Sequence, residues 1–501
     1  MRTSLLGAHP TRHLMSFRAF AVRAGTAANA AGRRSFNSST FSMAQQARTL
    51  STSLGARPLS AAAYEVKELE GDEKNDVVFE SKYGLRTVLL NRPNKLNSLN
   101  GSMIRKIVPR LVEWEKSDMA NVVVLKGSGD RALCAGGDVA ALAKLNQDSP
   151  DGWKKSADYF ALEYQLDHYI ATYQKPFISF MDGITMGGGV GLSIHAPFRI
   201  ATERTVFAMP ETTIGFFPDV GASFFLPRMN GSVGTYLALT SDRLNGPNVF
   251  YSGIATHYLH STSLPDLEAR LAELRFRDDD PLPKRLELIN ETLEEFCTGL
   301  PYDQPMQLGG HVRQAIDRCF SKNNKQLATL QKRSPTAVHV ALRQMRVGGK
   351  WSISETFEKE HQIASKFMQH HDFTEGVTAL LVRKVGAKWQ PESLEAIPAS
   401  ENVARPFFDF SQDQKLELFT DRTYSEYPYA TLGVPNEKEI QSIVSGNAYT
   451  PDQLTQIVIS SRKGRQGVKE VVEEIISRKT TVDDQGKVKW LADESVATSR
   501  L

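Results

Sequence analysis

The residues most able to do chemistry in this sequence are a glycine cluster and the backbone that follows it. Gly187, Gly188 and Gly189 stand together in the run Gly183–Gly191, and the proline-free run Val190–Ile194 predicts a short helix behind them. Glycines let a ligand approach the backbone closely, and the first N–H groups of a helix have no partner within it. Such a loop can present hydrogen-bond donors and a positive dipole end to a developing negative charge.

Two carboxylates follow this loop, and each lies beside a proline. Glu211 ends the run Met209–Glu211, and Asp219 lies in Phe216–Gly221. Such a pair can supply a nucleophile or general base and a second group that orients water. Taken singly, a glycine triplet is more typical of a tight turn, and each acid is explained as well by capping or turn formation. Together, in this order, they predict an active site that stabilises an anion.

Alternating strands and helices must position these residues. The apolar runs at 121–126 and Pro176–Met181 are typical of buried strands. The first leads through Gly136–Gly137 into a helix for which Asp138 is the expected N-cap, and the second leads into Gly187–Gly189. The repeated order of strand, loop and helix predicts an α/β fold in which the two glycine loops face one pocket.

Further elements are expected on both sides of this centre. They are strands at Val77–Glu80 and Leu85–Leu90, a loop at Asn91–Leu99, helices at Ser102–Lys116 and Trp153–Tyr173, largely helical segments at Leu259–Leu300, Gly309–Gln331 and Ser352–Ala387, and helices at Glu437–Ser445 and Pro451–Ser461, the last capped by Thr450. The expected organisation is a leader at 1–64, a core with the active site at 65–258, a helical region at 259–398 and a C-terminal extension at 399–501.

The leader differs in charge from the rest of the chain. Its 64 residues hold eight arginines and no Asp, Glu or Lys, so a chain of net charge +3 has a body of net charge −5. An acid-free segment rich in Arg, Ser and Ala is typical of a mitochondrial transit peptide, and a basic arm that binds nucleic acid is the alternative. The acidic body argues against nucleic-acid binding by charge alone. No apolar run approaches the ~18 residues of a spanning helix, so no membrane contact is predicted.

No metal, disulfide or nucleotide cofactor is predicted. Cys134, Cys297 and Cys319 form no CxxC pair, and none of the eleven histidines has HExxH spacing. His168 and His195 are interpreted as packed residues, and Cys134 lacks an adjacent base that would make it a nucleophile. The cysteines are interpreted as small buried residues that suit a reducing compartment.

Two motifs carry a resemblance to a known family. Cys134–Asp138 resembles the AGxD signature, and Gly183–Gly189 resembles the GxxxGGG signature, of the crotonase (enoyl-CoA hydratase/isomerase) superfamily. With Met209–Glu211 and Phe217–Gly221, the pattern is similar to the 3-hydroxyisobutyryl-CoA hydrolase branch. The resemblance extends over roughly residues 77–397. It implies a crotonase-like spiral of ββα repeats with a C-terminal helical region, and an acyl-CoA substrate with no separate cofactor.

The resemblance also implies roles for individual residues. The N–H groups of Gly137 and Gly188 would bind the thioester oxygen, Glu211 would attack the carbonyl or activate water, and Asp219 would orient water or bind the 3-hydroxyl group. Hydratases of the superfamily carry a glutamate where this chain has Gly191, which favours hydrolysis. The implied substrate-binding residues are Glu163, Gly188, Glu211, Asp219, Leu96, Asn97 and Ala135, with Leu96 and Asn97 in the CoA-binding loop and Ala135 against the adenine.

Two roles of different classes remain open. The first is hydrolysis of 3-hydroxyisobutyryl-CoA, and of 3-hydroxypropionyl-CoA, in the valine catabolism of the mitochondrial matrix. The second is a structural place in the mitochondrial small ribosomal subunit, because proteins similar to this family are known there and residues 399–501 offer an attachment. The two roles are compatible, and so is a homo-oligomer. A hydratase or isomerase is a third candidate, weakened by Gly191.

Overall fold

The computed structural model describes residues 59–302, 325–398 and 400–491. Nearly all of the predicted leader, and most of the helical segment predicted at Gly309–Gln331, lie outside the described residues.

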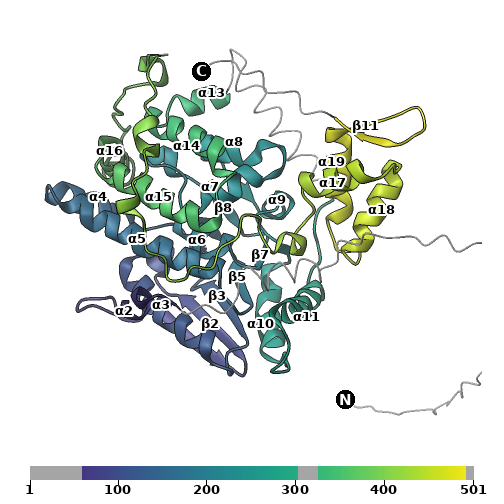
Figure 1. Ribbon diagram of the computed structural model, residues 1–501. Helices are drawn as coiled ribbons and strands as arrows, with labels where there is room; N and C mark the ends of the chain where they lie inside the picture. Colours follow the sequence, from purple (N-terminus) through teal and green to yellow (C-terminus); the bar gives the residue numbers. More distant parts are fainter. Residues whose placement is uncertain (1–58, 303–324, 399, 492–501) are drawn as a thin grey trace, which may run out of the picture. The chain divides into compact units, whose positions relative to one another are not determined.

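A six-stranded sheet forms the larger layer of the core (Figure 1). Its first two strands form an antiparallel hairpin and the other pairs are parallel. In spatial order the strands are β1 (Val77–Lys82), β2 (Leu85–Leu90), β3 (Val122–Gly127), β5 (Phe177–Met181), β7 (Phe198–Ala201) and β10 (His257–Tyr258). The strands predicted at Val77–Glu80 and Leu85–Leu90 and both predicted buried strands are therefore confirmed.

The chain enters a second, smaller sheet after β3, β5 and β7 of the first. Its strands, in order, are β4 (Ala132–Cys134), β6 (Ile184–Met186), β8 (Val206–Ala208) and β9 (Leu244–Asn245). Thus β3, β5 and β7 are each followed by a short strand of the second sheet, and then by α4 (Val139–Asp148), α6 (Gly188–Ile194) and η2 (Glu211–Ile214), respectively. This repetition is the spiral of ββα turns that the resemblance implied.

Long helices cover the sheets where their apolar positions recur at helical spacing. Helix α3 (Gly101–Lys116) buries Met103, Ile107 and Leu111, and the Asn100 side chain caps it by accepting a hydrogen bond from the Met103 N–H. In Figure 1, α5 (Gly152–Ala171) and α15 (Ile353–Met368) lie side by side. The other principal helices are α8 (Val233–Thr240), α9 (Pro247–Tyr251), α10 (Leu264–Ala272), α11 (Leu282–Glu294), α14 (Pro335–Gly348) and α16 (His371–Val377).

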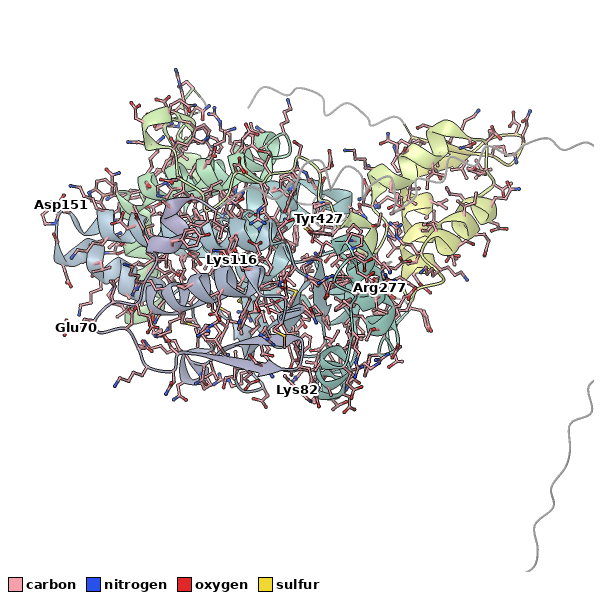
Figure 2. The ribbon with its side chains drawn as sticks, turned by 60° about the horizontal axis from the view of Figure 1, so that its bottom comes forward. Glu70, Lys82, Lys116, Asp151, Arg277 and Tyr427 are labelled. Carbon is pink, nitrogen blue, oxygen red and sulfur yellow. The ribbon has the colours of Figure 1, made fainter. Side chains whose placement is uncertain are left out.

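The first part of the predicted C-terminal extension packs into the core. Phe419 is fully buried and its ring meets Tyr169 of α5 edge-on at 6.3 Å. Arg422 forms a buried ion pair of 2.9 Å with Glu115 of α3. Tyr427, labelled in Figure 2, donates a hydrogen bond of 2.6 Å to the carbonyl of Ala196. Residues 404–434 are thus a structural part of the core.

The second part of the extension is a small helical module. It comprises α17 (Glu437–Gly446), α18 (Pro451–Ser461), α19 (Val468–Lys479) and a hairpin of β11 (Thr480–Val482) and β12 (Val488–Trp490). Thr450 caps α18 in a reciprocal capping box with Gln453, which confirms the predicted cap. Arg465 joins the module to the core, because it pairs with Glu294 and its Nη2 lies 3.1 Å from Nε2 of His257.

Asp138 does not use its side chain as the predicted cap of α4. It occupies the N-cap position, but its carboxylate accepts hydrogen bonds from Arg92 (3.1 Å) and Lys95 (3.3 Å). The predicted N-cap position is therefore confirmed, but the capping hydrogen bond is not made, because the carboxylate is engaged by the two cations Arg92 and Lys95.

Replacing Phe419 by alanine should destabilise the whole core. A fully buried phenylalanine truncated to alanine typically costs about 3–5 kcal/mol, since apolar contacts are lost and a cavity remains. Urea unfolding followed by fluorescence measures the change, and Val482→Ala on the exposed hairpin is the control. A Phe419→Ala change below about 1 kcal/mol would show that residues 404–434 contribute little to the core.

Candidate active site

The two glycine loops bring two backbone N–H groups close together. Leu99 donates to the carbonyl of Gly136 (2.8 Å) and accepts from the N–H of Asp138 (2.8 Å), so the N–H of Gly137 points away from Leu99. No backbone acceptor among the described residues takes this N–H. Gly188 is the first residue of α6, so its N–H has no acceptor within the helix. A Cβ atom at position 188 would lie 3.4 Å from the Gly137 nitrogen.

Three carboxylates meet the glycines at the start of α6. A Cβ atom at position 187 would lie 3.2 Å from Oε1 of Glu211, and one at position 188 would overlap Oε1 of Glu163. A Cβ atom at position 191 would overlap the carboxylate of Asp167. Glycine at positions 187, 188 and 191 is therefore what allows the acids to approach this helix so closely.

Glu211 and Asp219 are both buried, but their hydrogen-bond environments differ. Glu211 opens η2, is 5% exposed, and its Oε2 has no hydrogen-bond partner among the described residues. Asp219 is 4% exposed and accepts a hydrogen bond of 2.7 Å from the hydroxyl of Tyr164. The sequence did not predict Tyr164, since an aromatic residue on a long helix is ordinarily part of the core. Its position next to Glu163 was the available signal.

Glu360 on α15 fixes the loop that carries Asp219. Its carboxylate accepts hydrogen bonds from the N–H groups of Gly221 (2.7 Å) and Ser223 (2.8 Å). The same loop contains Val220, whose φ of 53° is unusual for a β-branched residue. We infer that Glu360 stabilises this strained backbone. Sequence reasoning missed it, because one acid on an amphipathic helix gives no signal of burial.

Burial shifts the ionisation of every acid in this region. It raises the pKa of Asp219 to about 7 and the pKa of Glu360 to about 8. Burial is also the main reason why the pKa of Glu163, Asp167 and Glu211 lies well above the usual range, and the negative charge of neighbouring acids adds to it. Perturbed carboxyl groups gathered around unpartnered N–H groups are the mark of a functional site.

The predicted CoA-binding loop has a defined backbone. Asn97 is fully buried, and its side-chain amide donates to the carbonyls of Ser128 (3.0 Å) and Ala132 (2.9 Å). Leu96 has a φ of 51°, and its carbonyl accepts from the N–H of Ala135 (3.0 Å). The structure thus brings Leu96, Asn97 and Ala135 together. Their contact with CoA stays a prediction.

The cysteine and histidines near the site are packed groups. Burial raises the pKa of Cys134 to about 12, so its thiol remains protonated at neutral pH. Burial lowers the pKa of His168 to about 3 and that of His195 to about 4, which leaves both imidazoles uncharged. His195 lies 2.9 Å from the carbonyl of Val220 and so supports the loop of Asp219.

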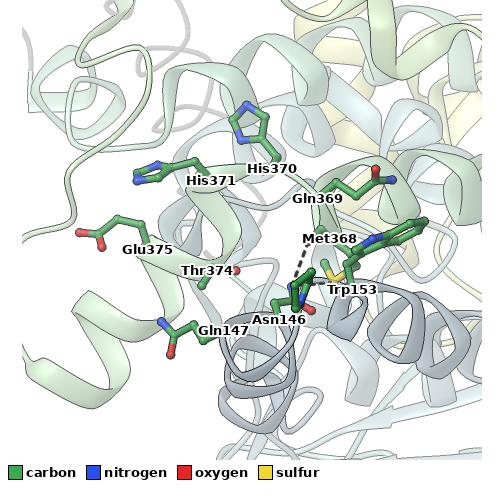
Figure 3. A pocket seen from close by; sticks show the side chains of 10 residues that line it. Asn146, Gln147, Trp153, Met368, Gln369, His370, His371, Thr374 and Glu375 are labelled. Carbon is green, nitrogen blue, oxygen red and sulfur yellow. Dashed lines mark hydrogen bonds between the residues drawn. The ribbon is translucent and has the colours of Figure 1, made fainter.

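A separate cleft of about 580 Å³ opens between the α4–α5 connection and the α15–α16 connection (Figure 3). Trp153, His370, His371 and Glu375 line it, and none of the five buried acids does. Within the described ranges, no group of His, Cys, Asp or Glu is arranged to hold a metal ion. In the same part of the chain, no helix is long and apolar enough to cross a membrane.

The fold and the paired glycine loops define a crotonase-fold protein, and the chain belongs to the enoyl-CoA hydratase/isomerase family, whose model matches residues 85–326 and 322–407. The small ribosomal subunit protein mS47 of Neurospora crassa is 54% identical over 92% of this chain and 96% of its own length. The mitochondrial 3-hydroxyisobutyryl-CoA hydrolase of Gallus gallus is 40% identical over 65% of this chain and 87% of its own.

A solved structure supports the fold assignment. The crystal structure of a carnitinyl-CoA dehydratase from Mycobacterium thermoresistibile is 29% identical to this chain, with a TM-score of 0.60. The match covers 69% of this chain and 99% of that protein.

The ligand-free protein should lose stability as the pH rises from about 4 to about 8. A buried acid with a raised pKa stabilises the fold fully below its unfolded pKa, and this contribution is lost as the pH rises through the folded pKa. For Asp219 the folded pKa is about 7 against an ordinary pKa of 3.8 for an aspartate, which corresponds to a loss on the order of 4 kcal/mol.

Urea unfolding at several pH values tests this expectation. Asp219→Asn should flatten the decline, while Asp151→Asn, at an exposed acid at the start of α5, should leave it unchanged. Parallel curves for the native protein and Asp219→Asn would contradict the assignment.

Proposed function

We propose that this chain hydrolyses acyl-CoA thioesters, with 3-hydroxyisobutyryl-CoA and 3-hydroxypropionyl-CoA as its substrates. The observation that carries the proposal is the proximity of the N–H groups of Gly137 and Gly188 to Glu211, whose Oε2 has no hydrogen-bond partner among the described residues. The products are the free hydroxy acid and CoA, as in the valine catabolism of the mitochondrial matrix. No separate cofactor is needed, since CoA is part of the substrate.

The two N–H groups supply the electrostatic part of the reaction. The thioester oxygen binds between Gly137 and Gly188, and negative charge develops on it when the carbonyl carbon becomes tetrahedral. Fixed donors in a site without water stabilise this charge with little reorganisation, and each is typically worth about 3–4 kcal/mol of barrier. The positive end of α6 adds to this effect, because Gly188 is its first residue.

Glu211 supplies the nucleophile or the general base. As a nucleophile, its carboxylate attacks the carbonyl carbon, the C–S bond breaks, and the CoA thiolate takes up a proton. Water then hydrolyses the resulting anhydride and restores Glu211. As a general base, Glu211 takes a proton from water, which attacks directly. In both routes Asp219, held by Tyr164, orients water or the substrate hydroxyl.

Gly191 disfavours the addition of water to a double bond. Hydratases of the superfamily use one glutamate at this position and a second at that of Glu211, so this chain retains one of the pair. The hydrolase name of the relative from Gallus gallus also favours thioester hydrolysis. That relative is mitochondrial by name, and the acid-free, arginine-rich leader supports the same location.

Loss of either acid should abolish CoA release. We expect the chain without its first 58 residues to release CoA from both hydroxyacyl thioesters, and Glu211→Ala or Asp219→Ala to lower kcat at least 100-fold. A thiol reagent measures free CoA, with acetyl-CoA and crotonyl-CoA as comparison substrates. Full activity of Glu211→Ala would refute the assignment, as would conversion of crotonyl-CoA without release of CoA.

A single turnover in oxygen-18 water separates the two routes of Glu211. Direct attack by water labels the product acid at once, whereas label that first enters Glu211 establishes the anhydride route.

We propose association with the mitochondrial small ribosomal subunit as a second function. The observation that favours it is the match to the Neurospora crassa relative, named as a small ribosomal subunit protein, over nearly the whole chain. The hydrolase from Gallus gallus matches a much smaller share of this chain. The module of residues 437–491, beyond the core, therefore provides an attachment to a ribosomal partner.

Deleting residues 437–501 should release the protein from ribosomes. The deletion spares residues 404–434, which pack into the core, but it removes Arg465, so thermal melting first checks that the remaining chain is folded. Sedimentation of mitochondrial extracts on sucrose gradients, followed by immunodetection, measures the association. Glu211→Ala is the matched control, because it alters the site and leaves the module intact. Undiminished co-sedimentation of the deleted chain would remove this module as the attachment.

A further inference from the structure

Asp167 is a buried acid that the proposed reaction does not use. It lies on α5, four residues after Glu163, so the two carboxyl groups project from the same face of the helix, one turn apart. Glu163 approaches the start of α6 at Gly188, and Asp167 approaches the same helix at Gly191, three residues further on. Asp167 therefore lies further along α6 than Gly188, which binds the thioester oxygen in the proposed reaction.

The loop of Asp219 bounds Asp167 on a second side. A Cβ atom at position 191 would meet both the Asp167 carboxylate and, at 2.8 Å, the Cβ atom of Val220. The charges of Glu163, Asp219 and Glu360 all act on Asp167. Asp167 therefore lies among Glu163, Asp219 and Glu360. These three acids belong to α5, the loop after η2 and α15, which are the elements that enclose the site.

Neither oxygen of Asp167 has a hydrogen-bond partner among the described residues, although the side chain is fully buried. By contrast, Glu360 accepts two backbone N–H bonds and Asp219 accepts the Tyr164 hydroxyl. An anion without donors is strongly disfavoured in such a place, and burial raises the pKa of Asp167 well above its usual range. The protonated group then carries an O–H donor, which is disfavoured while it has no acceptor.

We propose that Asp167 is a specificity-determining residue whose carboxyl group donates a hydrogen bond to an oxygen on the acyl chain of the substrate. The inference rests on the proposed function and deepens it, because it assigns recognition of the hydroxyl group to α5. The substrates are then acyl thioesters that carry oxygen beyond the carbonyl carbon. An acyl group without that oxygen leaves the buried donor unpartnered and is disfavoured.

Paired substrates test this assignment. The kcat/KM for 3-hydroxyisobutyryl-CoA is divided by that for isobutyryl-CoA, which lacks the hydroxyl group, in the full chain and its variants. Asp167→Leu should lower this ratio by about 10- to 100-fold through the hydroxylated substrate alone. Asp167→Asn keeps a neutral donor and should hold the ratio within about threefold. Asp167→Ala replaces the leucine variant if thermal melting shows that the latter does not fold.

Gln165→Leu is the matched control, since Gln165 lies on the same helix but donates to the carbonyl of Glu417. It should leave the ratio unchanged. An unchanged ratio in Asp167→Leu would overturn the proposal, and so would an equal fall with both substrates, which would show a structural role.

A binding experiment separates this proposal from the proposed function. If the native chain releases no CoA from either thioester, hydrolysis fails but recognition remains measurable by calorimetry with the unreactive thioether analogues of the two substrates. Tighter binding of the hydroxylated analogue, lost in Asp167→Leu and kept in Asp167→Asn, supports the proposal. Equal affinity of the native chain for both analogues, or binding of neither, overturns it.

Discussion

Close packing of carboxyl groups against the glycines of α6 and of the turn before it is the constraint on which the site depends. Positions 187, 188 and 191 of the segment that opens α6 lie against Glu211, Glu163 and Asp167, respectively, and a Cβ atom at either of the last two would overlap the acid. Gly189 is equally confined, because a Cβ atom there would overlap the backbone of Cys134. The glycines therefore have two effects. They allow α6 to pack closely on the neighbouring strand, and they allow carboxyl groups to approach its N-terminal end.

This arrangement disfavours ionisation of the acids. Five carboxyl groups are withdrawn from water, and each raises the pKa of its neighbours or has its own raised by burial. Glu360 and Asp219 accept hydrogen bonds, whereas no donor in the described part of the chain reaches Asp167. Chemically similar groups thus have different hydrogen-bond environments within one pocket, although burial raises the pKa of each.

The sequence predicted the elements that follow simple periodic rules. The apolar runs at β3 and β5 and the Thr450 cap of α18 are local signals, and the structure has each of them. The three-residue strands β4, β6 and β8 were not predicted from the residues, because a segment so short shows no period. Asp167 and Glu360 were missed for a related reason. A helix pattern predicts which face is buried, but acids are so seldom buried that the pattern alone does not predict a buried acid on that face.

The chain separates its chemistry from its C-terminal module. The buried acids lie on α5, η2, the loop after it and α15, whereas the module meets the core through Arg465, Glu294 and His257. Residues 404–434 connect the two parts, and they are tied to α3 and α5 by Arg422 and Phe419. A surface that binds a large partner can therefore change with little effect on the site, provided that this connecting stretch stays packed. Catalysis and attachment then depend on different parts of the chain, so evidence for one of these functions does not argue against the other.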